Sequence, residues 1–145
     1  MKIKRHLSGF TLVEILVVMF MIGILLTIAI PTFSRFIPQC RETSCIGYDP
    51  KEKGCVQDAI TSKKNVLQGI EIELRHSLKC KASWARTTAP RSSVIYVKDA
   101  QGQKYGQYTI PEDRFQQHYG DMGPGFELEA CFQMPNEEPR CTNES

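Results

Sequence analysis

The sequence predicts an α+β protein, with a long hydrophobic helix at the N-terminus followed by a small head in which a second helix packs on an antiparallel sheet. Three observations support this fold class. An apolar segment covers residues 10–30, apolar side chains recur at helical spacing over residues 56–81, and three strand-like segments come after them. Because the helices precede the strands, the order is typical of an α+β fold.

The apolar segment reads FTLVEILVVMFMIGILLTIAI and contains one charged residue, Glu14. A helix of this length is roughly 31 Å long, which matches the thickness of a bilayer core. Apolar side chains surround the whole helix, so it needs burial in lipid or among other helices. Basic residues precede the segment, as is typical of a cytoplasmic end. We therefore expect a hydrophobic helix over residues 10–37 that crosses a membrane once.

Two other interpretations of this segment compete. A cleavable secretory signal has an apolar region of about 7–15 residues and a small-residue cleavage site, whereas this segment is longer and the following PTFSRFIPQ lacks such a site. An uncleaved signal anchor fits the basic residues but does not explain Glu14. A carboxylate inside a membrane helix is costly and needs a partner. The partner expected here is a new α-amino group at Phe10, on the same subunit or on a neighbour.

The residues SGFTLVE, from Ser8 to Glu14, resemble the class III leader of type IV prepilins and pseudopilins. The family pattern is a short basic leader that ends in glycine, then phenylalanine, then glutamate as the fifth mature residue. The resemblance covers about residues 1–35. It implies that residues 1–9 are a leader, that prepilin peptidase cuts between Gly9 and Phe10, and that the new amine of Phe10 is methylated.

The resemblance also implies an assembly mechanism. Glu14 pairs with the amine of the adjacent subunit as the helix leaves the membrane for the filament core, where water competes little with the attraction between opposite charges. Pro31 lies where many members of the family carry a helix-kinking proline. The implied partners are the peptidase, other pilin-like subunits, an inner-membrane assembly platform and membrane lipid. The implied location is the inner membrane with the head outside, and then a cell-surface or periplasmic filament.

We expect one globular head over residues 38–145. Residues 39–54 are rich in proline, glycine and charge, which favours a loop and departs from pilins whose first helix runs unbroken into the head. Residues 56–81 are interpreted as the second helix. Strands are predicted at 93–98, 104–110 and 126–132, with DAQG as a hairpin connection and a short helical turn before the last strand.

Six cysteines follow the apolar segment, and an even number in a small exported domain favours disulfides. Type IV pilins commonly carry a C-terminal disulfide loop, so the resemblance suggests a bond between Cys131 and Cys141. The remaining four allow three pairings, of which one is Cys45–Cys55 together with Cys40–Cys80. A zinc site is not favoured, because the spacing is not a zinc pattern and no histidine lies close in sequence.

The sequence does not favour catalysis, and no cofactor or metal is expected. The three histidines are scattered along the chain and are expected at the surface, and no local catalytic signature is present. Some pseudopilins hold calcium in C-terminal loops, but the carboxylates available for this here follow no EF-hand pattern. The histidines are His6, His76 and His118, and the carboxylates are Asp99, Glu112, Asp113 and Asp121.

These observations predict a structural subunit, namely a pilin, minor pilin or pseudopilin of a type IV pilus, a DNA-uptake filament or a type II secretion filament. The small net charge of +2 gives no indication of nucleic-acid binding, although the resemblance leaves such a partner open. One alternative is a tip adhesin or binding module that displays the disulfide-bonded head. Another is a signal-anchored periplasmic protein that is neither cleaved nor polymerised.

Overall fold

The computed structural model describes residues 9–33 and 37–145, and within the first stretch it describes side chains as far as residue 27. The chain divides into two compact units, Met1–Phe36 and Ile37–Ser145, which are treated separately below. Most of the predicted leader, including its basic residues and His6, lies outside the described residues. The predicted head and most of the predicted hydrophobic helix lie within them.

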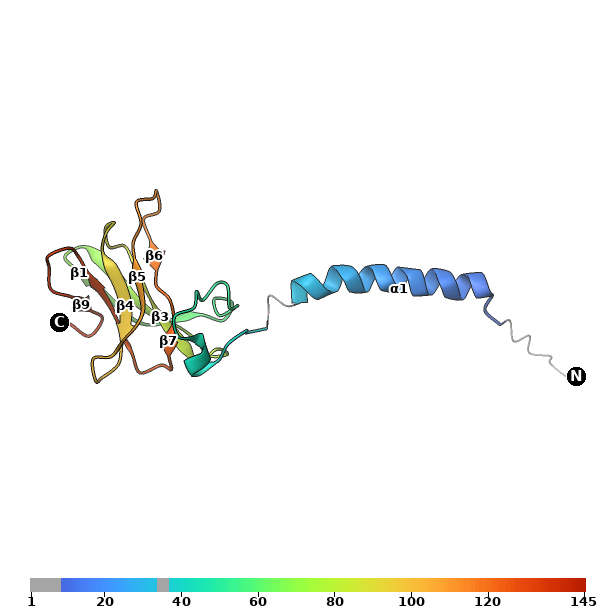
Figure 1. The fold of residues 1–145 in the computed structure, drawn as a ribbon, viewed down its shortest axis with the longest axis horizontal. Coiled ribbons are helices and arrows are strands. Elements are labelled where there is room, and N and C mark those ends of the chain that lie inside the picture. Colours follow the sequence, from blue (N-terminus) through green and yellow to red (C-terminus); the bar gives the residue numbers. More distant parts are fainter. Residues whose placement is uncertain (1–8, 34–36) are drawn as a thin grey trace, which may run out of the picture. The chain divides into compact units, whose positions relative to one another are not determined.

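The described part of the N-terminal unit forms helix α1 (Leu12–Phe33), which is drawn in blue in Figure 1. Every described side chain from Phe10 to Thr27 is exposed. The helix continues through Pro31 to Phe33, so the proline does not end it, and the kink stays a prediction. Across residues 9–33 and 37–145, no helix combines the length and apolar character needed to cross a membrane. The expected membrane crossing is therefore not found there.

The head is built from two antiparallel sheets with one 3-10 helix, η2 (Glu42–Cys45) (Figure 1). The first sheet has the order β1-β2-β3-β6, and β7 also pairs with β3. Its strands are β1 (Ile60–Leu67), β2 (Ile70–Ser77), β3 (Ala82–Thr87), β6 (His118–Tyr119) and β7 (Gly123–Pro124). The second sheet has the order β5-β4-β8-β9. Its strands are β5 (Lys104–Thr109), β4 (Val94–Lys98), β8 (Glu129–Gln133) and β9 (Arg140–Cys141).

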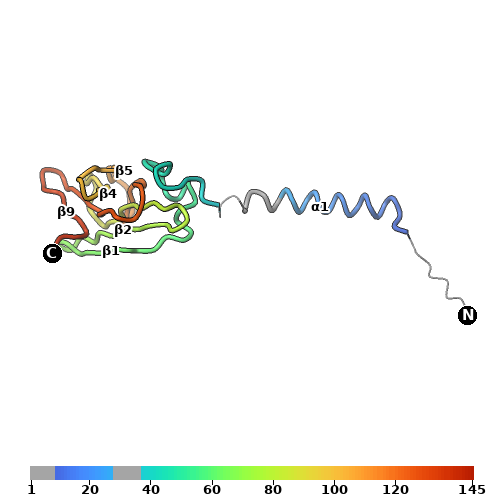
Figure 2. The backbone as a smooth tube through the Cα atoms, turned by 90° about the horizontal axis from the view of Figure 1, so that it is seen from below, coloured from blue at the N-terminus to red at the C-terminus, as the bar shows by residue number. Residues whose placement is uncertain are grey.

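The predicted second helix over residues 56–81 is wrong, because this stretch forms the β1–β2 hairpin, whose strands lie side by side in Figure 2. The connection is Gln68–Gly69, with φ of +52° and +80°. Two successive positive φ angles are typical of a two-residue hairpin turn and are incompatible with a helix. In IEIELR, apolar residues alternate strictly with charged ones, which is the period of a half-buried strand. Some of these residues also fit a helical spacing, which produced the wrong interpretation.

The hydrophobic core lies between the two sheets and takes side chains from both. Ile72 and Leu74 of β2 and Ile95 and Val97 of β4 are fully buried, and Phe132 of β8 joins them. Packing of two antiparallel sheets on one core makes the head a β-sandwich. The chain as a whole stays α+β only because α1 precedes the sandwich.

The three predicted strands in the second half of the head are found as β4, β5 and β8. The turn at residues 99–102 joins β4 to β5, as predicted. Strand β8 begins at Glu129, three residues later than expected. Leu128 and Ala130 are buried in the core as the alternation predicted, whereas Phe126 is exposed and precedes the strand. The short helical turn predicted before the last strand is absent from this described stretch, where β6 forms instead.

Candidate functional site

The segment around the predicted cleavage position is open. Gly9 is exposed, and a Cβ atom built on it would meet no atom within 4 Å. The side chain of Phe10 is 83% exposed. The chain itself therefore does not require glycine at position 9. A requirement for glycine would come from an enzyme that approaches the backbone closely.

Thr11 and Glu14 cap the N-terminus of α1. The Thr11 N–H donates to Oε2 of Glu14 at 3.0 Å, and the Glu14 N–H donates to Oγ1 of Thr11 at 3.3 Å. This reciprocal pair is a capping box, which satisfies two N–H groups that a helix start otherwise leaves unpaired. The negative charge of Glu14 also lies at the positive end of the helix dipole. The partner predicted for Glu14 was the amine of Phe10, on the same subunit or on a neighbour. The contact with Thr11 was not predicted, although T-x-x-E before an apolar run is a recognisable signal for it.

An apolar hollow runs along α1 beside this cap. Its volume is about 250 Å³, and it is lined by Phe10, Glu14, Ile15, Val18, Met19 and Ile22. Most of these residues have another member of the set three or four positions away, so they share one face of the helix. Glu14 is the one residue of this lining with a charged side chain, and the surface of the hollow is apolar. The face therefore suits an apolar partner.

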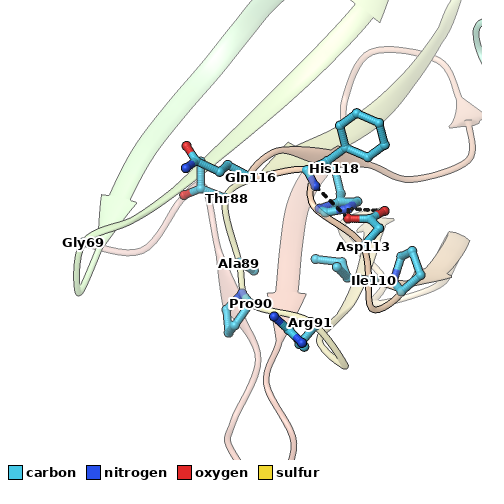
Figure 3. Close-up of a pocket in the computed structure, with 11 residues that line it drawn as sticks. Gly69, Thr88, Ala89, Pro90, Arg91, Ile110, Asp113, Gln116 and His118 are labelled. Atoms are coloured by element: carbon cyan, nitrogen blue, oxygen red, sulfur yellow. Dashed lines mark hydrogen bonds and ion pairs between the residues drawn. The ribbon is translucent and has the colours of Figure 1, made fainter.

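The head contains a hollow of about 500 Å³ whose lining includes a carboxylate–imidazole pair (Figure 3). Nε2 of His118 lies 3.0 and 3.1 Å from the two carboxylate oxygens of Asp113. Strand β6 positions His118, which pairs in register with Thr87 of β3. The pair therefore ties the segment between β5 and β6 to the first sheet.

Asp113 and His118 have unequal surroundings. Burial alone would raise the pKa of Asp113, but the hydrogen bonds from His118 and from the Phe115 N–H, with nearby positive charge, hold that pKa below its usual value. His118 is 9% exposed, and its Nδ1 atom is buried without a hydrogen-bond partner among the described residues. The expectation of a surface histidine is wrong for His118. His76 is also partly buried, with its ring 5.0 Å from that of Phe126.

A second hollow of about 440 Å³ is also lined by Asp113 and His118. Its walls include Asp49, Tyr119 and Asp121, and the Tyr119 hydroxyl donates to Asp49 at 3.5 Å. Burial raises the pKa of the Asp121 carboxyl, and the negative charges of Asp49 and Glu52 raise it further. This corner of the head therefore disfavours additional negative charge.

The carboxylates considered for calcium do not converge. Asp99 accepts the N–H groups of Gln101 and Gln103 inside the β4–β5 turn, and Asp113 is engaged by His118. Within the described part of the chain, clusters of three or more potential metal-ligating atoms consist of cysteines, in one case with Glu129. These cysteine sulfurs are already bonded to one another.

The structure contains three disulfides. Cys131–Cys141 is confirmed and links β8 to β9. The pairing of Cys45 with Cys55 and of Cys40 with Cys80 is wrong, because the bonds are Cys40–Cys45 and Cys55–Cys80. Cys80 lies in the turn between β2 and β3, which places it beside Cys55. Helix η2 reverses the chain, so that Cys45 lies beside Cys40. The turn at Cys80 was not predicted, because residues 56–81 were interpreted as a helix.

The first sheet also carries a row of charges that the sequence analysis missed. Glu73 is 4% exposed and lies opposite Lys64 of β1 and Arg86 of β3. Its carboxylate accepts a hydrogen bond from Nε of Arg86 at 2.6 Å and lies 3.6 Å from Nζ of Lys64. A buried carboxylate needs such partners. The alternation of charged and apolar residues in β2 is the signal that would have revealed the row.

Comparison with protein-family models gives two matches. Residues 43–124, more than half of the chain, match the family described as a protein of unknown function (DUF2690). Residues 4–30 match the prokaryotic N-terminal methylation motif, which is the class III leader signal of type IV pilins and pseudopilins. The second match contains Gly9, Phe10 and Glu14, and the first contains Cys45, Cys55 and other residues of the head. No curated protein and no solved structure matches the chain.

Proposed function

We propose that this chain, which belongs to the DUF2690 family of proteins of unknown function and carries the methylation motif of type IV pilins and pseudopilins, is a structural subunit of an extracytoplasmic filament. The observation that carries the proposal is the pairing of that motif with an apolar helix whose described side chains are all exposed. Such a helix is stable only when other apolar groups cover it. Copies of the same helix in a filament core would provide that cover.

In this proposal, prepilin peptidase cuts after Gly9, and Phe10 becomes the methylated N-terminus. The hollow on α1 then receives the helix of a neighbouring subunit, and Glu14 receives its amine. The capping box places the carboxylate at the start of the helix, four positions from Phe10. Before cleavage, the leader and the apolar segment hold the precursor at the inner membrane. We propose that the role is structural and not enzymatic.

The test of this proposal separates the charge of Glu14 from its capping role. Glu14→Gln keeps an oxygen that can accept the Thr11 N–H, whereas Glu14→Ala removes both the acceptor and the charge. We expect both variants to be cleaved normally and to enter sheared filaments at a level reduced by roughly tenfold or more, which corresponds to about 1.4 kcal/mol. Glu127→Gln, at an exposed position of the head, is the matched control.

Each outcome of this test has a distinct meaning. Wild-type incorporation of Glu14→Gln, together with failure of Glu14→Ala, would assign Glu14 to capping alone. Normal incorporation of both variants would remove the charge-pairing mechanism. A Gly9→Val variant that still loses residues 1–9 would remove the peptidase step.

A second candidate is a binding module at the filament tip, used in adhesion, DNA uptake or type II secretion. The two adjoining hollows of the head favour it, together with Phe115, whose side chain is 75% exposed between them. Abundance in sheared filaments separates a major subunit from a tip component. Retention of residues 1–9 in the mature protein would instead favour a signal-anchored protein.

A further inference from the structure

Two of the three disulfides in the head touch each other. The Sγ atom of Cys40 lies 3.8 Å from the Sγ atom of Cys55, although each is bonded to a different partner. All four sulfurs of Cys40, Cys45, Cys55 and Cys80 lie within 4.8 Å of one another. The third disulfide, Cys131–Cys141, belongs to a different buried cluster, beside Tyr96.

We propose that Cys40–Cys45 and Cys55–Cys80 form one thiol–disulfide exchange centre, whose substrate is a dithiol and in which reduction at Cys40 is passed to Cys80. Exchange requires a thiolate next to the disulfide that it attacks. The 3.8 Å separation provides this neighbour inside the folded head. The proposal rests on the head alone and is independent of filament assembly.

Burial determines where the dithiol reacts. Cys45, Cys55 and Cys80 are completely buried, whereas Cys40 is only partly buried. A thiolate of the dithiol therefore attacks Sγ of Cys40, the Cys40–Cys45 bond breaks, and Cys45 leaves as a thiolate. The second thiol of the dithiol then resolves the mixed disulfide. The products are a Cys40 thiolate, a Cys45 thiol and the oxidised dithiol, and two electrons have entered the protein.

The next step is redox-neutral. The Cys40 thiolate attacks Sγ of Cys55, a Cys40–Cys55 bond forms, and the Cys55–Cys80 bond breaks. Cys80 leaves as a thiolate and takes up, from solvent, the proton that the attacking thiol of the dithiol released when it ionised. Cys80 lies in the turn between β2 and β3, so the exchange releases that turn from Cys55. Cys55 is then bonded to Cys40, near the start of the head.

Partial reduction of the wild-type chain tests this relay. The full chain in detergent is treated with one equivalent of dithiothreitol, alkylated, and digested without further reduction. We expect alkylated Cys45 and Cys80 and a peptide linked through Cys40–Cys55. Alkylated Cys40 and Cys45 with an intact Cys55–Cys80 peptide would overturn the proposal.

A variant tests the redox-neutral step without any reductant. Cys45→Ser removes the bonding partner of Cys40 and leaves its thiol beside Cys55–Cys80, so alkylation is expected to divide between Cys40 and Cys80. The matched control is Cys141→Ser, which frees Cys131 away from the centre and is expected to be alkylated at Cys131 alone. Labelling of Cys40 alone in the first variant, or of several cysteines in the second, would contradict the proposal. If Cys45→Ser does not fold, the wild-type experiment decides.

Trp84 provides an independent signal. It is the single tryptophan of the chain and is buried in the same cluster as Cys45, Cys55 and Cys80. Disulfides quench tryptophan emission at close range, so opening this centre is expected to change the fluorescence of Trp84 in step with alkylation of Cys80. A change that follows only the opening of Cys131–Cys141 would contradict the assignment.

Discussion

The two units of this chain differ in how far their apolar side chains are exposed. The described apolar side chains of α1 are exposed, whereas most apolar side chains of the head are buried or partly buried and three disulfides cross-link it. Burial of apolar surface is the main favourable contribution to both folding and association. The head obtains this burial within its own unit, whereas in the proposed filament α1 would obtain it from neighbouring subunits. Under this proposal, the helix determines assembly and the head determines stability.

The largest effect on stability is expected from a matched pair of leucines, one in each unit. Leu74 is completely buried in β2, and Leu74→Ala is expected to lower the free energy of unfolding of the head by about 4 kcal/mol. Leu16 is 60% exposed on α1, and Leu16→Ala is expected to leave that free energy unchanged. Denaturant unfolding of the head, followed by Trp84 fluorescence, provides the measurement. Equal losses in both variants would mean that α1 contributes to the folding of the head.

The disulfides are expected to contribute according to the length of chain that they close. Cys55–Cys80 spans 25 residues and Cys131–Cys141 spans 10. The loop-entropy relation gives about 3.5 kcal/mol for the first and about 2.7 kcal/mol for the second. Thermal unfolding of the Cys55→Ser/Cys80→Ser and Cys131→Ser/Cys141→Ser double variants compares them. The opposite order would show that native-state packing outweighs chain entropy here.

A smaller effect is expected at the start of α1. Thr11→Val removes the hydroxyl that accepts the Glu14 N–H and is expected to cost about 1 kcal/mol of local helix stability. Thr11→Ser keeps the hydroxyl and serves as the control. Amide hydrogen exchange of residues 12–15 in detergent measures the difference. Equal protection in the two variants would argue against the capping box.

The smallest effects concern pH, and two carboxyls of the head are expected to act with opposite sign. Burial alone would raise the pKa of Asp58, but hydrogen bonds from the Ser77 hydroxyl and the Lys79 N–H hold it below its usual value. Asp58 therefore stabilises the head at neutral pH, and this stability is lost as the pH falls through the lowered pKa. Asp58→Asn is expected to destabilise at pH 7 and to have little effect in strong acid.

Asp121 is expected to behave in the opposite way. Its pKa is raised by burial and by the carboxylates of Asp49 and Glu52, so the ionised form opposes folding. Stability linked to Asp121 is present at low pH and is lost as the pH rises through the raised pKa. Asp121→Asn is expected to stabilise the head at pH 7, with the gain vanishing in acid. Urea unfolding at several pH values measures both variants, and shifts of the same sign would contradict the assignment.

The sequence was most informative where a few adjacent residues determine the structure. The motif from Ser8 to Glu14, the apolar helix behind it and the β4–β5 hairpin were predicted because each depends on local composition or spacing. The β1–β2 hairpin was missed because Ile70, Leu74 and Leu78 fit a helical repeat, and the alternation of Ile70, Ile72 and Leu74 was given too little weight.

The remaining features depend on contacts between distant segments. Cys55 meets Cys80 only because β2 turns back into β3, so the wrong secondary structure led to the wrong pairing. The Asp113–His118 pair depends on the position of β6, a strand of two residues with no clear sequence pattern. The charged row through Glu73 requires the register of three strands. Such features follow from topology, which a single sequence specifies only weakly.

The most direct test of the central claim is the intact mass and N-terminal residue of the protein isolated from its native cells without reduction. The account predicts an N-terminus at methylated Phe10 and a mass lower than that of the all-thiol chain by the hydrogens of its 6 cysteines. An N-terminus at Met1 in cells that contain prepilin peptidase would contradict it. That result would favour a signal-anchored protein, in which a partner other than a filament subunit covers the exposed helix.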